Sequence, residues 1–549
     1  MNSTHDVAAL RAVRDTLQRS GVHEAAALAQ RALAAGTSHP FLFNVVALQL
    51  EADGKLLDAA ASLRRGLAVS PDDVGCLHAL GLLALRLEEP EEARVSFERV
   101  IELQPGFAPA HVALGQALEA AGLLPPAEAR FNRALELQPD NLLAAAGLAG
   151  ILGRRGEHAA ARERAHQVLA AQPNYPPAAL VAAEADIALG EAPRAETGLR
   201  HLLADPRLSE VERSLALSVL GDSLDRQRRE ADAFAAYAES NRLRREHYAP
   251  KYAARGTLQY ANGLRDWFRA HPPRDLLSLV PPEVAASPAA GHAFLIGFPR
   301  SGTTLLEQVL AAHPFVVALE ERETLIDAVR EFMRAPGDLA RLGLADEAAL
   351  APLRESYWRR VAAAGVVVNG NVFVDKHPLN GLKLPLIARL FPEARVVVAV
   401  RDPRDVVWSC FRRRFRMSAP YYELLTLAGA AGLYDAVMEI TQQLIPALSL
   451  RAHVVKLESL VSDFDAEAAG VCDFLGIEFN PRMREFATRA RGVATASGAQ
   501  LARGLHGAGS GEWRRYREQL APVLPALERW VTRFGYEAAA GAAPQSTSA

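Results

Sequence analysis

Short apolar runs in the C-terminal half of the chain alternate with helical patterns of apolar residues. Ala293–Ile296 is typical of a buried strand, and apolar residues follow at helical spacing from Thr303 onward. Arg395–Val400 is a continuous apolar run that suits a central strand of a parallel sheet. This alternation predicts a doubly wound α/β domain with a parallel sheet over residues 292–537. Further candidate strands are Val366–Val368, Val372–Val374 and His453–Leu457.

The N-terminal half repeats its small, aromatic and proline positions with a period of 34 residues. This period is typical of tetratricopeptide repeats, an α-helical solenoid in which each unit is a pair of antiparallel helices. Small residues let the helices approach closely, and the proline ends the second helix. The register predicts about seven helix pairs over residues 6–247, followed by a junction over residues 248–291. The repeating positions are Ala59, Ala93, Ala127, Ala161, Ala195, Gly81, Gly115, Phe97, Phe131, Pro71, Pro105, Pro139 and Pro173.

An array of such repeats stacks into a superhelix with a concave face. We expect that face to bind a protein or peptide, as an acceptor substrate, a partner or a second subunit in a homodimer. A spacer without a binding role is the alternative. The sequence does not identify what is bound.

A glycine loop joins the first predicted strand to the helix behind it. The segment from Gly297 to Thr304 reads G-x-x-x-x-G-T-T, in which Gly302 precedes the helix. A strand, a glycine loop and a helix aim backbone N–H groups and a helix N-terminus at an anion. Thr303 occupies the place of the lysine in nucleotide-triphosphatase loops. The loop therefore predicts a site for a phosphate-like group that is bound in a different way.

A second anion site is predicted at the end of the central strand. Arg401 directly follows that strand, and Ser409 lies eight residues further on in the next helix. Arginine offers a planar fork that matches a phosphate. Two anion sites predict a nucleoside with anionic groups at both ends. The missing lysine and the lack of a clear magnesium ligand disfavour a metal-dependent phosphoryl transferase, and Asp402 is expected in a salt-bridged turn with Arg404.

The composition limits the classes of partner. A net charge of −3 gives no electrostatic footprint for nucleic acid or a membrane surface. Three widely spaced cysteines indicate neither a disulfide framework nor a zinc site. The first residues lack the features of a signal peptide, and no apolar run of about 18 residues occurs. We therefore expect a cytoplasmic protein without a membrane span and with a disordered tail at residues 538–549.

Five sequence blocks carry a resemblance to a known family. They read PRSGTTLLEQVLAAHP, ALEERETL, VDKHP, VVVAVRDPRDVVWSCF, and TASGAQLARG followed by GEWRRY. In this order they resemble the sulfotransferases. The chain looks most like bacterial proteins that join tetratricopeptide repeats to a tyrosylprotein-sulfotransferase-like domain, and the resemblance covers residues 293–536 and the repeats.

The resemblance implies 3′-phosphoadenosine 5′-phosphosulfate (PAPS) as the donor and a reaction without a metal. It implies that the glycine loop holds the 5′-phosphosulfate and that the second site holds the 3′-phosphate, which accounts for both anion sites. The implied residues are Arg300, Ser301, Gly302, Thr303 and Thr304 in the loop, and Arg401, Ser409 and Arg413 in the second site.

The resemblance also implies catalytic residues. Glu320 stands where the tyrosine-sulfating enzymes carry a catalytic glutamate, which acts as the general base. Its neighbour Glu321 is the rival, and a charged helix start is the structural alternative for the pair. Lys376 matches a lysine that stabilises the leaving phosphate oxygen, and His377 is a third candidate base.

The C-terminal segment matches a region that closes over the nucleotide in relatives. Ser497 matches a serine that helps stabilise the transition state. Gln500, Arg503 and Trp513 belong to the closing segment, in which Arg503 replaces the lysine of the tyrosine-sulfating enzymes. Its glycines suit a mobile lid, whereas an ordinary surface loop is the alternative. Leu457 departs from the family, because relatives often carry tyrosine there.

The predicted function is sulfuryl transfer from PAPS to a hydroxyl acceptor, with peptidyl tyrosine as the first candidate and a glycan, lipid or small metabolite as alternatives. An ATP-dependent kinase is the first alternative function, and it requires magnesium. A repeat scaffold that only senses a nucleotide is the second. The presence of Glu320, Lys376 and Ser497, which match catalytic residues of the family, disfavours the scaffold.

Overall fold

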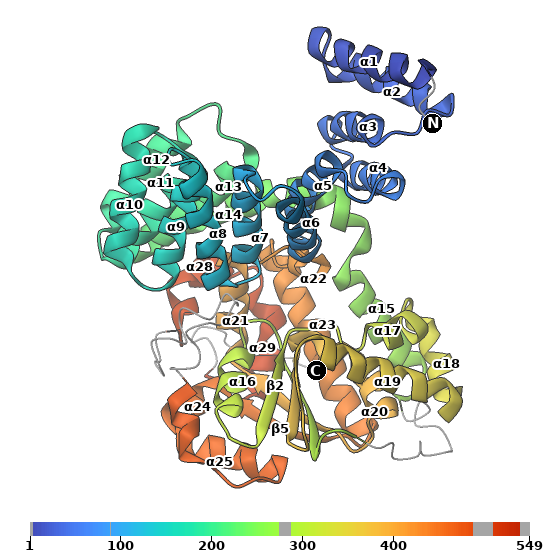
Figure 1. The fold of residues 1–549 in the computed structure, drawn as a ribbon. Helices are drawn as coiled ribbons and strands as arrows, with labels where there is room; N and C mark the ends of the chain where they lie inside the picture. The colour runs from blue at the N-terminus through green and yellow to red at the C-terminus, as the bar shows by residue number, and fades with distance from the viewer. Residues whose placement is uncertain (1–3, 88, 274–286, 487–508, 538–549) are drawn as a thin grey trace, which may run out of the picture. The chain divides into compact units, whose positions relative to one another are not determined.

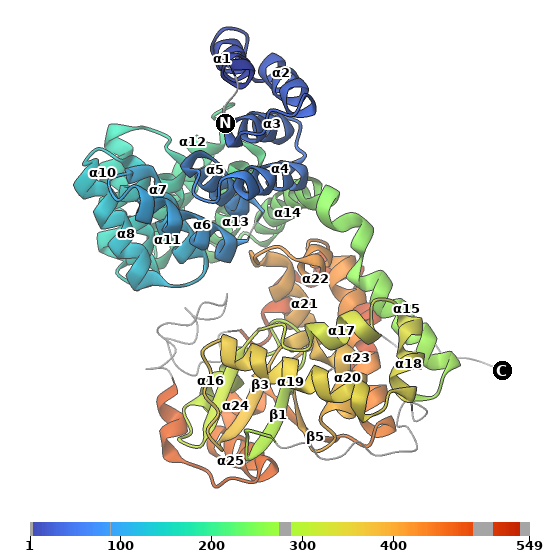
Figure 2. The same ribbon diagram turned by 45° about the vertical axis from the view of Figure 1, so that its right-hand side comes forward.

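The computed structural model describes residues 4–87, 89–273, 287–486 and 509–537. The chain forms two compact units, Met1–Pro206 and Arg207–Ala549. Figures 1 and 2 show the helices of the first unit from blue to green, and the sheet of the second in green to orange. No helix in the described ranges is both long enough and apolar enough to cross a membrane.

The first unit consists of consecutive pairs of helices, as the 34-residue period predicts (Figure 1). Each pair is antiparallel, with a short turn between its members. The helices are α1 (Thr4–Arg19), α2 (Val22–Ala34), α3 (Pro40–Ala52), α4 (Leu56–Val69), α5 (Val74–Arg86), α6 (Pro90–Leu103), α7 (Ala108–Ala120), α8 (Leu124–Leu137), α9 (Leu142–Arg154), α10 (His158–Ala171), α11 (Pro176–Ala188) and α12 (Ala192–Leu203).

The repeating aromatic rings pack directly against the repeating glycines. A Cβ added to Gly81 would lie 2.6 Å from the ring of Phe97 in the next helix. Gly115 and Gly147 have the same relationship to the ring of Phe131. Both phenylalanines are fully buried. The glycines therefore provide the space that each ring fills, which explains why the two residue types recur together.

The second unit begins with a further helix pair, α13 (Glu210–Arg226) and α14 (Glu230–Tyr252). It keeps the repeat pattern, because a Cβ at Gly221 would lie 2.6 Å from the ring of Tyr237. The pair packs against the α/β part, where the Asn241 amide donates a 2.8 Å hydrogen bond to the Phe411 carbonyl. Helix α15 (Thr257–Ala270) follows within the predicted junction.

Five parallel strands form the sheet of the second unit in the order β2-β3-β1-β4-β5. This sheet confirms the predicted α/β fold with a parallel sheet. Because all strands are parallel, their carboxyl ends lie at one edge. The strands are β1 (Gly291–Ile296), β2 (Val316–Glu320), β3 (Val372–Lys376), β4 (Arg395–Val400) and β5 (Arg451–Lys456).

Helices cover both faces of the sheet (Figure 2). Ala293 and Leu295 of β1 belong to a core with α16 and α25, whereas Phe294 faces the ring of Tyr357 on α19. The helices are α16 (Thr303–Ala311), α17 (Ile326–Phe332), α18 (Leu339–Leu344), α19 (Glu347–Ala363), α20 (Leu384–Leu390), α21 (Pro403–Arg412), α22 (Ala419–Glu423), α23 (Leu427–Ala447), α24 (Leu457–Ser462), α25 (Phe464–Leu475), α28 (Arg517–Leu520) and α29 (Leu524–Arg533).

Two local expectations differ from the structure. Val366–Val368 is not a strand but part of the loop after α19, where Val367 is exposed. The segment Val316–Glu320, in contrast, is an edge strand that ends at Glu320, where a charged helix start was the alternative. Its pairing with β3 supplies the hydrogen bonds that so short a segment cannot supply alone.

Candidate functional site

The glycine loop has the geometry that the sequence predicts, between β1 and α16. A Cβ at Gly297 would lie 2.5 Å from the Ala399 carbonyl oxygen of the neighbouring strand β4. Gly302 has a φ of 97°, and a Cβ there would lie 2.8 Å from a methyl carbon of Leu457. Both glycines are therefore required by close packing, and Gly302 also by its left-handed backbone.

Polar side chains and backbone amides meet in this loop. The Ser301 hydroxyl accepts a 3.2 Å hydrogen bond from the Phe298 amide. Thr303 and Thr304 begin α16 and are buried. Arg300 has a φ of 72°, an uncommon backbone conformation for a residue with a side chain. The first amides of α16 thus lie beside a strained, arginine-bearing turn, an arrangement suited to an anion.

The structure brings the two predicted anion sites together. The Arg300 Nε donates a 3.0 Å hydrogen bond to the Ser409 Oγ. The Arg401 Nη1 donates to the Arg300 carbonyl at 3.3 Å, and its Nη2 donates to the Gly509 carbonyl. The side chains of Arg401 and Ser409 are almost fully buried. Residues from the loop, β4 and α21 therefore surround one place at the carboxyl edge of the sheet.

Excess positive charge characterises this place. Burial, and then the charges of Arg413 and Arg401, lower the pKa of Arg300 to about 9. Burial and the neighbouring Arg412 also lower the pKa of Arg413. The Nε atoms of Arg401 and Arg413 are buried and have no hydrogen-bond partner among the described residues. Unpaired buried donors and crowded guanidinium groups fit a ligand with several negative charges.

A folded segment after residue 508 is fastened to α21. The Asp405 carboxylate accepts hydrogen bonds from the Gly511 amide at 2.6 Å and the Trp513 amide at 2.9 Å. The Arg404 guanidinium lies 4.0 Å from the centre of a Trp513 ring. Asp402 and Arg404 form the expected salt bridge, at 2.7 Å. The predicted contacts of Ser497, Gln500 and Arg503 lie outside the described residues.

Lys376 lies at the carboxyl end of β3, and three carboxylates surround it. Its side chain is fully buried. The Nζ lies 2.7 Å from Glu321 Oε1, 3.2 Å from Glu307 Oε2 and 3.6 Å from Glu320 Oε1. Glu320 ends β2, which pairs with β3, and Glu307 comes from α16. The strand pairing explains why both predicted glutamates reach the predicted lysine.

The protonation of this cluster is shifted. Burial raises the pKa of Glu307 to about 7 against the opposing effect of Lys376. Burial raises the pKa of Glu320 as well. Burial alone would lower the pKa of Lys376, but the three carboxylates outweigh it and raise the pKa above its usual value. Such shifts are typical of groups that handle protons.

His377 has other partners. Its Nε2 lies 3.2 Å from Glu323, whose second oxygen accepts a 2.6 Å hydrogen bond from Lys383. Burial would raise the pKa of Glu323, but these two partners hold it far below its usual range. The residue before Lys376, Asp375, is held by hydroxyl donors from Thr324 and Tyr357 at 2.7 and 2.8 Å.

Sequence reasoning missed Glu307, Asp405 and the contacts of Asp225. Asp225 on α13 accepts a 2.6 Å hydrogen bond from the Tyr516 hydroxyl and pairs with Arg515 at 2.9 Å and Arg412 at 3.5 Å. Of these residues, only Glu307 could have been noticed in the sequence, because it is a charged residue among the apolar positions of a helix. The partners of Asp225 lie too far along the chain to be inferred.

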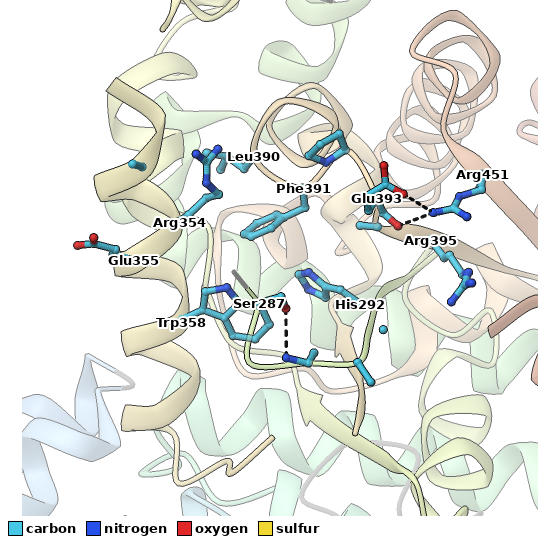
Figure 3. A pocket seen from close by; sticks show the side chains of 16 residues that line it. Ser287, His292, Arg354, Glu355, Trp358, Leu390, Phe391, Glu393, Arg395 and Arg451 are labelled. Carbon is cyan, nitrogen blue, oxygen red and sulfur yellow. Dashed lines mark hydrogen bonds and ion pairs between the residues drawn. The ribbon is translucent and has the colours of Figure 1, made fainter. Parts of the chain in front are cut away.

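A separate cavity of about 550 Å³ opens at the amino ends of β1, β4 and β5 (Figure 3). Its positive side chains already have protein partners. Arg451 pairs with Glu393 at 3.0 Å, and the Arg395 Nη1 donates to the Leu475 carbonyl at 2.8 Å. Aromatic side chains such as Trp358 form another wall. This cavity lies at the opposite edge of the sheet from the glycine loop.

Comparisons with known proteins agree with this description. The model of the sulfotransferase family matches residues 293–481, and a model of the tetratricopeptide repeat matches residues 84–151. The fold and these matches define a tetratricopeptide-repeat protein with a sulfotransferase-family domain. The described residues include no group of three or more side chains that could hold a metal ion.

Several curated proteins are similar to this chain. An uncharacterized protein of Aquifex aeolicus is 26% identical over 350 residues, which are 60% of this chain and 43% of that protein. Protein-tyrosine sulfotransferase 1 of Danio rerio is 27% identical over 257 residues, which are 44% of this chain and 66% of that protein. The chain thus spans less than two thirds of the length of these relatives.

Among solved structures, the sulfotransferase domain of the Synechococcus PCC 7002 olefin synthase covers 47% of this chain and 99% of its own, with 22% identity and a TM-score of 0.35.

Proposed function

We propose that this protein transfers a sulfuryl group from PAPS to a hydroxyl acceptor. One observation carries the proposal. The loop arginine Arg300, the strand-end arginine Arg401 and Ser409 converge on a place where the buried Nε atoms of Arg401 and Arg413 have no hydrogen-bond partner among the described residues. The Lys376 cluster lies at the same edge of the sheet, at the end of the strand that neighbours β1. The membership of residues 293–481 in the sulfotransferase family supports the same reaction class.

The residues present fit the donor. The α16 amides with Ser301, Gly302, Thr303 and Thr304 would hold the 5′-phosphosulfate. Arg401, Ser409 and Arg413 would hold the 3′-phosphate. When bound, PAPS supplies the sulfuryl group, whose bond to the bridging oxygen breaks and leaves its electron pair on the departing phosphate. The Lys376 ammonium and Arg300 would stabilise the charge that develops there.

A carboxylate at the end of β2, either Glu320 or the next residue Glu321, would take the proton from the acceptor hydroxyl; both are called β2 carboxylates below. Glu320 and Glu321 both lie beside Lys376, and two observations support Glu321 as the base. Glu321 accepts the 2.7 Å hydrogen bond from Lys376, and its φ of 35° is strained. Glu320 Oε1 lies 3.6 Å away in a buried position. Strain of this kind is concentrated at functional positions, so the geometry favours Glu321 over Glu320. His377 is the weakest candidate, because Glu323 already engages it.

We propose a peptidyl tyrosine as the acceptor, bound with the help of the repeats. The support is that several relatives are protein-tyrosine sulfotransferases and that repeat arrays offer extended concave binding surfaces. The relatives are only distantly similar, so a glycan, lipid or small-molecule acceptor stays an alternative within the same reaction class.

The direct test incubates the purified protein with ³⁵S-labelled PAPS and a panel of tyrosine peptides, glycans and phenols. Parallel samples contain a chelator, or ATP with magnesium in place of PAPS. We expect a labelled acceptor in the PAPS samples whether or not chelator is present. Transfer only from ATP with magnesium would indicate a kinase. Nucleotide binding without transfer to any acceptor would indicate a sensing scaffold.

A further inference from the structure

Glu307 differs from the other carboxylates that contact Lys376, because it comes from α16 and not from the end of β2 or the residue after it. Its side chain is buried, with 3% of its surface exposed. It lies four residues after Thr303, one helical turn behind the glycine loop. Glu307 therefore links the helix that starts at the loop to the lysine at the end of β3.

The proposed reaction creates a need for such a residue. When Glu321 or Glu320 takes up the acceptor proton, that carboxylate becomes neutral, and of the two carboxylates that remain beside Lys376 only Glu307 is almost fully buried. A buried ammonium without a counter-charge is strongly destabilised. Glu307 lies 3.2 Å from the Lys376 Nζ and is too deeply buried to meet a large acceptor. It can therefore stay ionised while the base changes its charge.

We propose that Glu307 is a positioning residue that holds the Lys376 ammonium in place while a β2 carboxylate acts as the base. This inference rests on the proposed function. The proton passes from the acceptor hydroxyl to the β2 carboxylate, and Glu307 exchanges no proton in that step. Lys376 keeps Glu307 as an ionic partner throughout and stays directed at the oxygen where charge develops.

The cluster predicts a pH dependence. The charged groups that face Glu307 are Lys376 from β3, Glu320 at the end of β2 and Glu321 directly after it. Burial raises the pKa of Glu307 to about 7, so its ionised fraction increases as the pH rises through neutrality. Because only the ionised form holds Lys376, the catalytic rate should rise over the same range. Replacement of Glu307 by glutamine removes that dependence.

The first experiment observes Lys376 without any substrate. The chain has five lysines, so selective ¹³Cε labelling of lysine gives a simple NMR spectrum, in which a Lys376→Arg variant assigns the signal. We expect the Lys376 titration in Glu307→Gln to move to lower pH, with a dissociation constant at least tenfold larger than in the wild type. Gln308→Ala, a change at the next position of the same helix, should leave the titration unmoved. An unchanged Lys376 titration in Glu307→Gln would overturn the proposal.

The second experiment measures transfer by the same proteins. We expect Glu307→Gln to lower kcat about 10- to 100-fold, to lose the rise of rate near pH 7, and to keep the Kd for adenosine 3′,5′-bisphosphate within about twofold. Glu307→Asp should restore part of kcat. A shifted lysine titration with an unchanged kcat would also overturn the proposal. If the wild type transfers no sulfuryl group, the proposed function fails, while the NMR titration still decides whether Glu307 holds Lys376.

Discussion

Arg300 and Ser409 are 109 positions apart in the chain, yet the Arg300 Nε donates a 3.0 Å hydrogen bond to the Ser409 Oγ. This contact joins the glycine loop after β1 to the helix after β4. The neighbouring strands β1 and β4 hold the two segments in register. A residue at each anion site therefore contacts a residue at the other, and the glycine loop, Arg401 and Ser409 form one cationic site.

Arg401→Ala should weaken nucleotide binding. The Arg401 Nε is buried and lacks a hydrogen-bond partner among the described residues, so an anion would be its natural partner. Loss of a charge-assisted contact to a phosphate costs about 1.5–3 kcal/mol, or roughly a 10- to 150-fold higher Kd for adenosine 3′,5′-bisphosphate, measured by calorimetry. Arg416→Ala, at an exposed position, is the matched control. Equal affinities of the two variants for the nucleotide would show that Arg401 does not contribute to nucleotide binding.

Gly302→Ala should disrupt the loop. The φ of 97° disfavours any side chain, and the added methyl group would lie 2.8 Å from Leu457. Left-handed backbone costs an alanine about 1–2 kcal/mol, and the clash adds to this cost. We expect lower thermal stability and a loss of nucleotide binding. The double variant with Leu457→Ala relieves the clash but not the backbone strain, so it should recover only part of the stability. Full recovery would show that the backbone of Gly302 is not constrained.

Glu321→Gln should lower kcat by roughly 10²- to 10⁴-fold, the usual contribution of a general base. The Kd for adenosine 3′,5′-bisphosphate should remain close to that of the wild type, because the glutamates contact Lys376 and not the arginines. Glu320→Gln is the matched variant and should have a smaller effect. A larger loss of kcat in Glu320→Gln would assign the base to Glu320 instead.

The pH profile distinguishes the same two residues. A general base must be ionised, so the rate falls as the pH drops through its pKa. Burial raises the pKa of Glu320 above that of an ordinary glutamate, so a Glu320 base would lose activity at a higher pH than an unperturbed carboxyl. We expect the acid limb of kcat/KM to survive in Glu320→Gln. Disappearance of that limb in Glu320→Gln would contradict the preference for Glu321.

Asp225→Asn should destabilise the C-terminal unit. Asp225 on α13 binds Tyr516, Arg515 and Arg412, and its side chain is only 14% exposed. Loss of a largely buried ionic partner costs about 3–5 kcal/mol when the cations stay behind, which a thermal or denaturant unfolding curve measures. Asp232→Asn, which breaks an exposed pair with Arg229, should cost less than about 1 kcal/mol. Similar losses of unfolding free energy in both variants would show that the contacts of Asp225 on α13 do not stabilise this unit.

Local patterns account for the parts of the fold that the sequence predicts. The run Ala293–Ile296 and the glycines of the following loop are neighbours in the chain, so their geometry is encoded within a few residues. The repeat register is likewise local, because the Phe97 ring fills a space left by Gly81, 16 positions earlier. Strand β2 is short, ends in charged residues and pairs with β3. The local sequence pattern therefore does not predict it.

The site residues that the sequence misses depend on distant partners. Glu307 looks like an ordinary helical glutamate until Lys376 arrives from β3, 69 positions later. Asp225 and Arg412 are 187 positions apart. Motifs predicted Glu320, Lys376, Arg401 and Ser409 as site residues, but the burial that raises the pKa of Glu320 comes from packing alone.

The most direct test of the proposed reaction is a mass balance. Wild-type protein is incubated with PAPS and the best acceptor, and adenosine 3′,5′-bisphosphate and sulfated acceptor are quantified by liquid chromatography. We expect the two products in a 1:1 ratio, and neither product from a variant that carries both Glu320→Gln and Glu321→Gln. Release of the nucleotide without a sulfate ester, or formation of a phosphate ester, would contradict sulfuryl transfer as the function of this chain.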